Sequence, residues 1–189
     1  MENKEIYNFL KKEIPELTEI DLVSFSEKWN IKKKLKRNEI SSLAEKEINI
    51  YFIKKGAIKI FTEIEERQII LEFGYKGLCI FNLPSFFTEK PSEYYFEAIR
   101  DSELIGISKK NYYEFIEINP VFSNFWHRSI ERLLLNFVER EVDILTHSPK
   151  IKYQRLFERK PELFQNIPKK YIANYLGLSP ETLSRLSKS

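Results

Sequence analysis

The sequence has a single cysteine, Cys79, among its 189 residues, and this scarcity excludes several kinds of protein. One thiol cannot build a disulfide framework, a cysteine-based zinc site or a cysteine-ligated iron–sulfur cluster. Only two histidines are present, which leaves little room for a histidine-rich metal site. Five glycines and eight prolines are too few for a fibrous repeat or a low-complexity chain. We expect a folded protein of one or two domains with no metal and no cofactor.

Long apolar runs and the motifs of catalysis are also missing. The longest uncharged stretch, residues 77–88, is too short to span a bilayer, and the first 16 residues contain no apolar signal core. We find no nucleophile with its base, no phosphate-binding loop and no glycine-rich dinucleotide turn. We therefore expect a cytoplasmic protein that is not an enzyme and does not enter membranes. Cys79 lies in an apolar run and is expected to be a buried, unreactive thiol.

Apolar residues make up 42% of the chain and aromatic residues 14%, so a substantial core can form. The first 28 residues have helical periodicity that Pro15 interrupts. Short runs with β-type alternation and turn signals between them follow at residues 49–55, 57–62, 68–73, 94–99 and 103–108. This spacing predicts an antiparallel sandwich or barrel, with helices on either side of it in the sequence.

Helical periodicity returns after Ser108, which is a plausible N-cap, and restarts at Asn119 and Pro120. A long helix is predicted from residue 121 to about 146, because this stretch has no glycine or proline. One apolar seam with near-heptad spacing consists of Trp126, Ile130, Leu133, Phe137 and Ile144, and Arg140 is its one interruption. The helix could pack only on its own domain, but its apolar face is broad enough to favour a second contact with a partner copy. We expect a homodimer with this seam at the interface.

The charge is unevenly distributed along the chain. Residues 149–189 carry a net charge of +6, whereas residues 1–148 carry −3, so the overall charge of +3 conceals a basic C-terminal segment. This asymmetry indicates a polyanionic partner, although solvated basic faces are common.

The segment from Lys169 to Leu186 has the pattern of two short helices joined by a tight turn. Ala173 is small where a second helix must cross closely, and Gly177 suits the positive φ of a helix C-cap. Ser179 and Pro180 are suited to begin the second helix. The pattern resembles the helix-turn-helix of DNA-binding regulators, and a purely structural helical hairpin is the alternative.

In the DNA-binding interpretation, the second helix enters the major groove. Arg185 could donate two hydrogen bonds to guanine, Glu181 could accept one from cytosine, and Ser179 suits a phosphate oxygen. The residues expected to face DNA are Lys169, Lys170, Ser179, Pro180, Glu181, Thr182, Ser184, Arg185 and Lys188.

The order of strands, long helix and helix-turn-helix resembles the Crp/Fnr family of bacterial transcription regulators over roughly residues 20–189. Residues 51–56, the turn around Gly77, residues 98–108 and residues 118–120 carry the resemblance in the barrel, and residues 179–186 carry it in the head. It implies an α+β fold with three parts. These are helices and a jelly-roll barrel of the cyclic-nucleotide-binding type (1–118), a dimerisation helix (119–148) and a DNA-binding head (149–189). The implied partners are double-stranded DNA, a second copy of the chain, RNA polymerase and an effector of unknown identity.

Two departures from the family pattern affect the expected function. Relatives that bind cyclic nucleotide hold its phosphate with an Arg-Ser pair after a Gly-Glu-Leu turn. The corresponding positions, which form a degenerate effector pocket, are Asn82 and Leu83 at the turn and Ser92 and Glu93 at the pair. A carboxylate in place of the guanidinium repels a phosphate, so we predict no tight binding of cyclic AMP or cyclic GMP. The chain also ends soon after the recognition helix, so we expect a head without the usual wing.

These features leave two hypotheses. The chain is either a homodimeric DNA-binding regulator, or a ligand-binding or protein-interaction module whose barrel is the working part and whose head is vestigial.

Overall fold

The computed structural model describes residues 3–41 and 48–187. Two helices open the chain, α1 (Lys4–Glu13) and α2 (Glu19–Glu27). The strands are β1 (Ile31–Leu35), β2 (Ile40–Ser41), β3 (Asn49–Ile64), β4 (Arg67–Tyr75), β5 (Cys79–Phe81) and β6 (Tyr95–Ser108), and helix α3 (Leu83–Thr88) lies between the last two. The remaining elements are the helices α4 (Lys109–Ile118), α5 (Pro120–Leu145), α6 (Pro149–Arg159), α7 (Pro161–Asn166), α8 (Lys169–Tyr175) and α9 (Pro180–Leu186).

Within the described residues, six antiparallel strands form one sheet in the order β1-β6-β3-β4, with β2 beside β6 and β5 beside β3. The predicted antiparallel architecture is confirmed. The sequence suggested separate strands on either side of Gly56, but β3 continues through this residue. Gly56 adopts a φ of 98°, and the pairing of β3 with β6 shifts register around it. The glycine therefore bends a continuous strand and does not end it.

The helices begin where the sequence supplies side-chain caps. The hydroxyl of Ser108 accepts a hydrogen bond from the Asn111 N–H, and the side chain of Asn119 accepts one from the Phe122 N–H at 3.0 Å. Ser148 caps α6 in the same way. Proline occupies the first turn of α5, α6 and α9, where its missing N–H costs nothing. The predicted start of the long helix is thus confirmed.

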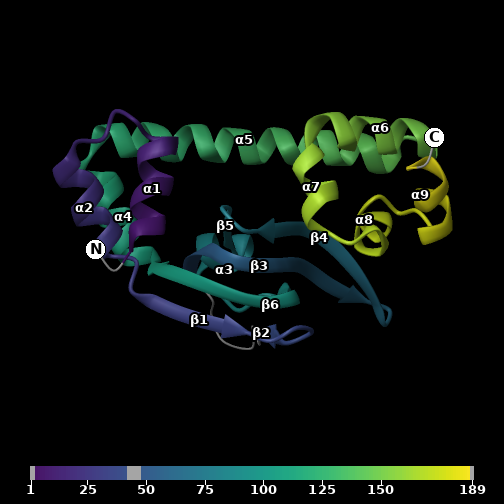
Figure 1. Cartoon of the computed structure of the whole chain (residues 1–189), viewed down its shortest axis with the longest axis horizontal. Helices are drawn as coiled ribbons and strands as arrows, with labels where there is room; N and C mark the ends of the chain where they lie inside the picture. The colour runs from purple at the N-terminus through teal and green to yellow at the C-terminus, as the bar shows by residue number, and fades with distance from the viewer. Residues whose placement is uncertain (1–2, 42–47, 188–189) are drawn as a thin grey trace.

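The chain arranges its helices at two ends of the sheet, and α5 bridges them (Figure 1). Helices α1, α2 and α4 gather at one end of α5, whereas α6 to α9 lie at the other end, beside β4. One apolar cluster joins the first group of helices to the start of α5 and to the sheet. A second cluster joins the sheet residues Phe61, Ile70 and Phe73 to Leu156, Ile172 and Tyr175 of the C-terminal helices. The C-terminal helices therefore share a core with the sheet.

Candidate nucleic-acid interface

Helices α8 and α9 form the helical corner that the sequence predicted. The N–H of Leu178 donates to the carbonyl of Ala173 at 2.8 Å, and the N–H of Gly177 donates to the carbonyl of Asn174 at 3.0 Å. This pair of hydrogen bonds is a Schellman motif, which requires the left-handed φ of 64° that Gly177 adopts. The hydroxyl of Ser179 then accepts a hydrogen bond from the Thr182 N–H and begins α9.

The apolar residues of the corner are turned inward. Ala173 and Leu183 are buried, together with Ile172 and Leu176, so the two helices cross tightly. Leu186, near the end of α9, is half-buried. The crossing fixes the direction in which α9 presents its other side chains.

The predicted DNA-facing residues lie on the outer side of this corner. Those that are exposed are Lys169, Lys170, Ser179, Pro180, Glu181 and Arg185, and those that are half-buried are Thr182 and Ser184. Lys188 lies outside the described residues. Glu181 and Arg185 are one helical turn apart on α9, so their side chains project from the same face. The backbone N–H of Glu181 and the hydroxyl of Ser179 lower the pKa of the Glu181 carboxyl below its ordinary value.

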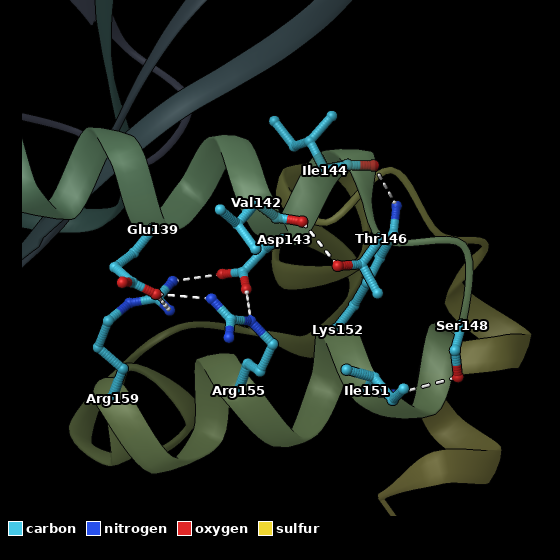
Figure 2. A network of polar contacts seen from close by, with 10 residues as sticks. All are labelled: Glu139, Val142, Asp143, Ile144, Thr146, Ser148, Ile151, Lys152, Arg155 and Arg159. Atoms are coloured by element: carbon cyan, nitrogen blue, oxygen red, sulfur yellow. Dashed lines mark hydrogen bonds and ion pairs between the residues drawn. The ribbon is translucent and has the colours of Figure 1, made fainter.

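Helix α6 is fastened to the end of α5 by a buried ionic network (Figure 2). Asp143 of α5 is only 1% exposed and receives Arg155 Nε at 2.7 Å and the guanidinium of Arg159. Glu139, one turn earlier, receives Arg155 at 2.6 Å. The hydrogen bond that Arg155 donates to the Asp143 carboxylate raises the pKa of Arg155. Breaking the ion pairs of a buried carboxylate is costly in free energy, so we expect the connection between α5 and α6 to be rigid.

Asp143 is thus buried among arginines and is not a solvated acid at the helix end. The basic C-terminal segment also uses other cations for contacts within the protein. Lys160 pairs with Glu72 of β4 at 2.9 Å, and the ammonium of Lys152 donates to the carbonyls of Ile144 and Leu176. Much of the positive charge of residues 149–160 therefore serves the internal structure.

A second attachment joins the first helix of the corner to the edge strand of the sheet. The side-chain oxygen of Asn174 accepts the N–H of Ile70 at 3.2 Å, and its amide nitrogen donates to the carbonyl of Gln68 at 3.0 Å. Asn174 thus pairs with β4 as a neighbouring strand would, and it covers part of an open sheet edge.

Arg140 of α5 completes this attachment. Its guanidinium donates to the carbonyl of Ile70 at 2.9 Å and stacks on the ring of Tyr175, 4.8 Å from the centroid. The sequence analysis did not identify Asn174 or Arg140 as attachment residues. The available signal was the interruption of an apolar helical seam by one charged residue, Arg140.

The long helix α5 presents a different face from the one expected at a dimer interface. Trp126 is buried in its own domain and Ile130 packs against the same core, while Leu133 and Phe137 border cavities beside the sheet. The more exposed apolar stripe lies one step around the helix and consists of Leu134, Leu135, Val138, Val142 and Leu145. Of the predicted seam, Ile144 is 39% exposed and Phe137 38%.

The residues of the predicted effector loop bond to one another. Asn82 is fully buried, and its side-chain oxygen accepts the N–H of Ser85 at 3.2 Å and the hydroxyl of Ser92 at 2.9 Å. Its amide nitrogen donates to the carbonyl of Tyr94. Glu93 is exposed. The loop is thus closed on itself by the hydrogen bonds of these side chains.

A cavity of about 340 Å³ lies between this loop, the sheet and α5. Leu83 lines it, and Arg140 is the one cation among the described residues that do so. Cys79 also borders it and is exposed, so the expectation of a buried thiol is wrong. Desolvation by its surroundings nevertheless raises the pKa of this thiol to about 12, which makes it a weak nucleophile.

Comparison with known proteins identifies the architecture. Residues 32–119 match the sequence profile of the cyclic nucleotide-binding domain. A search of curated protein sequences found no significant match. In the described part of the chain, no helix has the length and apolar character needed to cross a membrane.

Solved structures with the same fold include transcription regulators. FixK2 from Bradyrhizobium japonicum is 18% identical with a TM-score of 0.64, over 84% of this chain and 82% of that one. A putative regulator of the Crp/Fnr family from Eubacterium rectale is 17% identical with a TM-score of 0.62, over 92% and 83%. A putative cAMP-binding regulatory protein from Silicibacter pomeroyi is 19% identical with a TM-score of 0.64, over 97% and 86%. The predicted fold class is confirmed: the chain has the fold of the Crp/Fnr regulators and contains a cyclic-nucleotide-binding-type domain.

Proposed function

We propose that this chain is a homodimeric, sequence-specific DNA-binding transcription regulator of the Crp/Fnr type that does not respond to cyclic AMP. The observation that carries the proposal is the exposed face of α9, on which Glu181 and Arg185 project one turn apart from a rigid helical corner. In this role the protein acts in the cytoplasm, and its macromolecular partners are duplex DNA and RNA polymerase.

The chemistry of α9 fits the major groove. The guanidinium of Arg185 is suited to donate two hydrogen bonds to O6 and N7 of guanine, and the ionised carboxylate of Glu181 is suited to accept one from the amine of cytosine. The low pKa of Glu181 favours this acceptor form at neutral pH. Lys169 and Lys170, exposed at the start of α8, are placed to attract phosphates without regard to sequence.

A two-fold dimer would present two such helices to one face of DNA. We infer that the stripe of Leu134, Leu135, Val138, Val142 and Leu145 forms the dimer contact, with Phe137 and Ile144 at its border. Five large apolar side chains on one helix face are costly to leave in water, and a second copy of α5 offers a matching surface. Recognition helices in such a dimer would read half-sites roughly 34 Å apart.

The proposed lack of response to cyclic AMP rests on the effector loop. The hydroxyl of Ser92 donates a hydrogen bond to the side chain of Asn82. The exposed residue beside them, Glu93, carries the same sign of charge as the phosphate. The one cation lining the adjacent cavity, among the residues described, is Arg140, which is engaged with Ile70 and Tyr175. A cyclic phosphate in this cavity would therefore meet a single cation that already bonds to the chain, and it would lack the dedicated arginine that the resemblance implies.

Selection of duplexes from a random library tests DNA recognition. The regulator predicts enrichment of a near-palindromic sequence, and substitution Arg185→Ala should weaken binding to it by about 10- to 100-fold, the usual cost of one base-reading arginine. Lys110→Ala is the matched control, since Lys110 is an exposed cation on α4, at the other end of α5 from the recognition helix (Figure 1). If no sequence is enriched, or if both variants weaken binding equally, the proposed base readout is wrong.

Sedimentation at micromolar concentration tests the dimer. The wild type should sediment as a dimer, and Val138→Glu should sediment as a monomer because it places a charge in the centre of the exposed stripe. Arg132→Gln, an exposed change on the same helix outside the stripe, should remain dimeric. A wild type that stays monomeric would remove the basis for palindromic recognition.

The alternative is a ligand-binding or protein-interaction module with a vestigial head. Internal pairing of Arg155, Arg159 and Lys160 favours it to a degree, because these cations are withdrawn from any phosphate. It predicts weak, sequence-independent DNA binding that is indifferent to Arg185→Ala.

A further inference from the structure

A second cavity, of about 210 Å³, lies among the N-terminal helices, at the opposite end of α5 from α8 and α9 (Figure 1). Its walls come from α1, α2, α4, α5 and the strands β3 and β5. Eight of the fourteen residues that line it are aromatic, and the others include Leu10, Ile130 and Leu133. The cavity is separate from the effector loop, since no residue from 82–94 lines it.

Two polar groups of the wall have no partner. The indole N–H of Trp29, a residue that is 1% exposed, makes no hydrogen bond to any described residue. The hydroxyl of Tyr112, a residue that is 6% exposed, likewise has no hydrogen-bond partner within the described parts of the chain. Unpaired buried donors are rare in folded proteins, because each forfeits its hydrogen bond to water. The indole N–H of Trp29 is such a donor, and the hydroxyl of Tyr112 lies on the wall of the same cavity without a partner among the described residues.

The charge of the wall limits what could occupy the cavity. None of the described residues that line it is ionised at neutral pH, and burial raises the pKa of Tyr112 so that its hydroxyl remains a neutral donor. An anion or a cation would lose its hydration in the cavity without a countercharge. The occupant must therefore be uncharged.

The size and shape of the cavity limit it further. An apolar cavity of roughly 150 Å³ is already large enough to hold benzene, so 210 Å³ suits one substituted ring. The rings of Phe25, Tyr112, Phe122 and Trp126 meet edge to face at 4.5–5.8 Å around the cavity, an arrangement that also receives a further aromatic ring favourably.

We propose that this cavity binds a small, uncharged aromatic molecule with one hydrogen-bond acceptor, which the indole N–H of Trp29 and the hydroxyl of Tyr112 recognise. The site is independent of DNA binding by the head, so the two proposals stand or fall separately.

Binding is tested with three molecules of matched size. Acetophenone is uncharged and carries a carbonyl acceptor, ethylbenzene has no acceptor, and benzoate carries a charge. Calorimetry on the full chain should show binding of acetophenone, weaker binding of ethylbenzene and no binding of benzoate. Both tryptophans of the chain, Trp29 and Trp126, line the cavity, so tryptophan fluorescence should change with the same concentration dependence. Absence of binding by acetophenone up to its solubility limit, or equal binding of benzoate, would overturn the proposal.

The substitution Tyr112→Phe isolates the polar contact. It removes a hydroxyl that has no partner in the described chain, so the fold should be retained. Acetophenone should bind about fivefold more weakly, which corresponds to one hydrogen bond, while binding of ethylbenzene should not change. Tyr113→Phe makes the same change at the next residue, outside the cavity, and should alter neither. Equal affinity of Tyr112→Phe and wild type for acetophenone would refute the recognition that we propose.

Discussion

The helix-turn-helix and the effector loop resemble the same family of regulators, but they use their polar side chains in opposite ways. In the head, the side chains that shape the corner are buried, and those suited to a ligand, Glu181 and Arg185, are exposed. In the loop, Asn82 and Ser92 bond to each other and leave no cation beside the cavity except Arg140, among the residues described. The two regions thus share the fold of one family, but only the head directs its polar side chains outward, whereas the loop bonds them to one another.

The head depends on its attachment to the rest of the chain, and this dependence offers the strongest test of its integrity. The variant Asp143→Ala should lower the free energy of unfolding by about 3 kcal/mol, near the low end for a broken buried ion pair because the arginines are partly solvated. Urea denaturation measures the change. Glu141→Ala, an exposed acid on the same helix, should cost little, and equal losses in the two variants would show that the network contributes nothing specific.

The attachment of Asn174 to the sheet edge should contribute less to the free energy of unfolding than the ionic network of Asp143 does. Asn174→Ala removes two hydrogen bonds to β4, so we expect a loss of about 1–2 kcal/mol and faster amide hydrogen exchange at Ile70. Asn124→Ala, at an exposed position of α5, is the control and should leave both quantities unchanged. Unaltered exchange at Ile70 in Asn174→Ala would mean that the amide does not hold the head against the strand.

The turn of the head should be sensitive to backbone conformation alone. At Gly177 a side chain would meet open space, so Gly177→Ala should cost about 1 kcal/mol through the left-handed φ only. Gly177→Asn should cost less, since asparagine tolerates this conformation better. Thermal unfolding of the two variants tests whether backbone conformation is the cause. A larger loss of stability in the asparagine variant than in the alanine variant would instead indicate steric conflict.

The loop should show the smallest effect of all. Glu93→Arg supplies a guanidinium near the position where the family resemblance leads us to expect one, yet we expect no binding of cyclic AMP, because Ser92 remains bonded to Asn82. Calorimetry of wild type and variant should show no heat of binding in either. Micromolar affinity in the variant would show that charge alone separates this loop from a functional one.

Sequence patterns predicted the parts of the molecule that local chemistry determines. The caps at Ser108, Asn119 and Ser179 and the turn at Gly177 follow from side-chain and backbone preferences within a few residues, and each prediction is confirmed. The antiparallel strands were also recognised, although the bend at Gly56 was taken for a strand end.

Features that join distant segments could not be obtained in this way. The pairing of Asn174 with β4 depends on tertiary placement across more than one hundred residues. The burial of Asp143 depends on the way α6 folds back onto α5, which brings in arginines 12 and 16 residues further along the chain. For the same reason periodicity identified α5 as apolar on several sides but did not show which side faces the sheet. Trp126 consequently proved to be a core residue of its own domain.

The comparison between head and loop is tested most directly by the affinity for a selected DNA site, measured by fluorescence anisotropy with and without saturating cyclic AMP. We predict tight, sequence-specific binding that is the same in both conditions. Specific binding that appears only when cyclic AMP is present would contradict the account, because it would require the loop to bind the nucleotide and the head to depend on it.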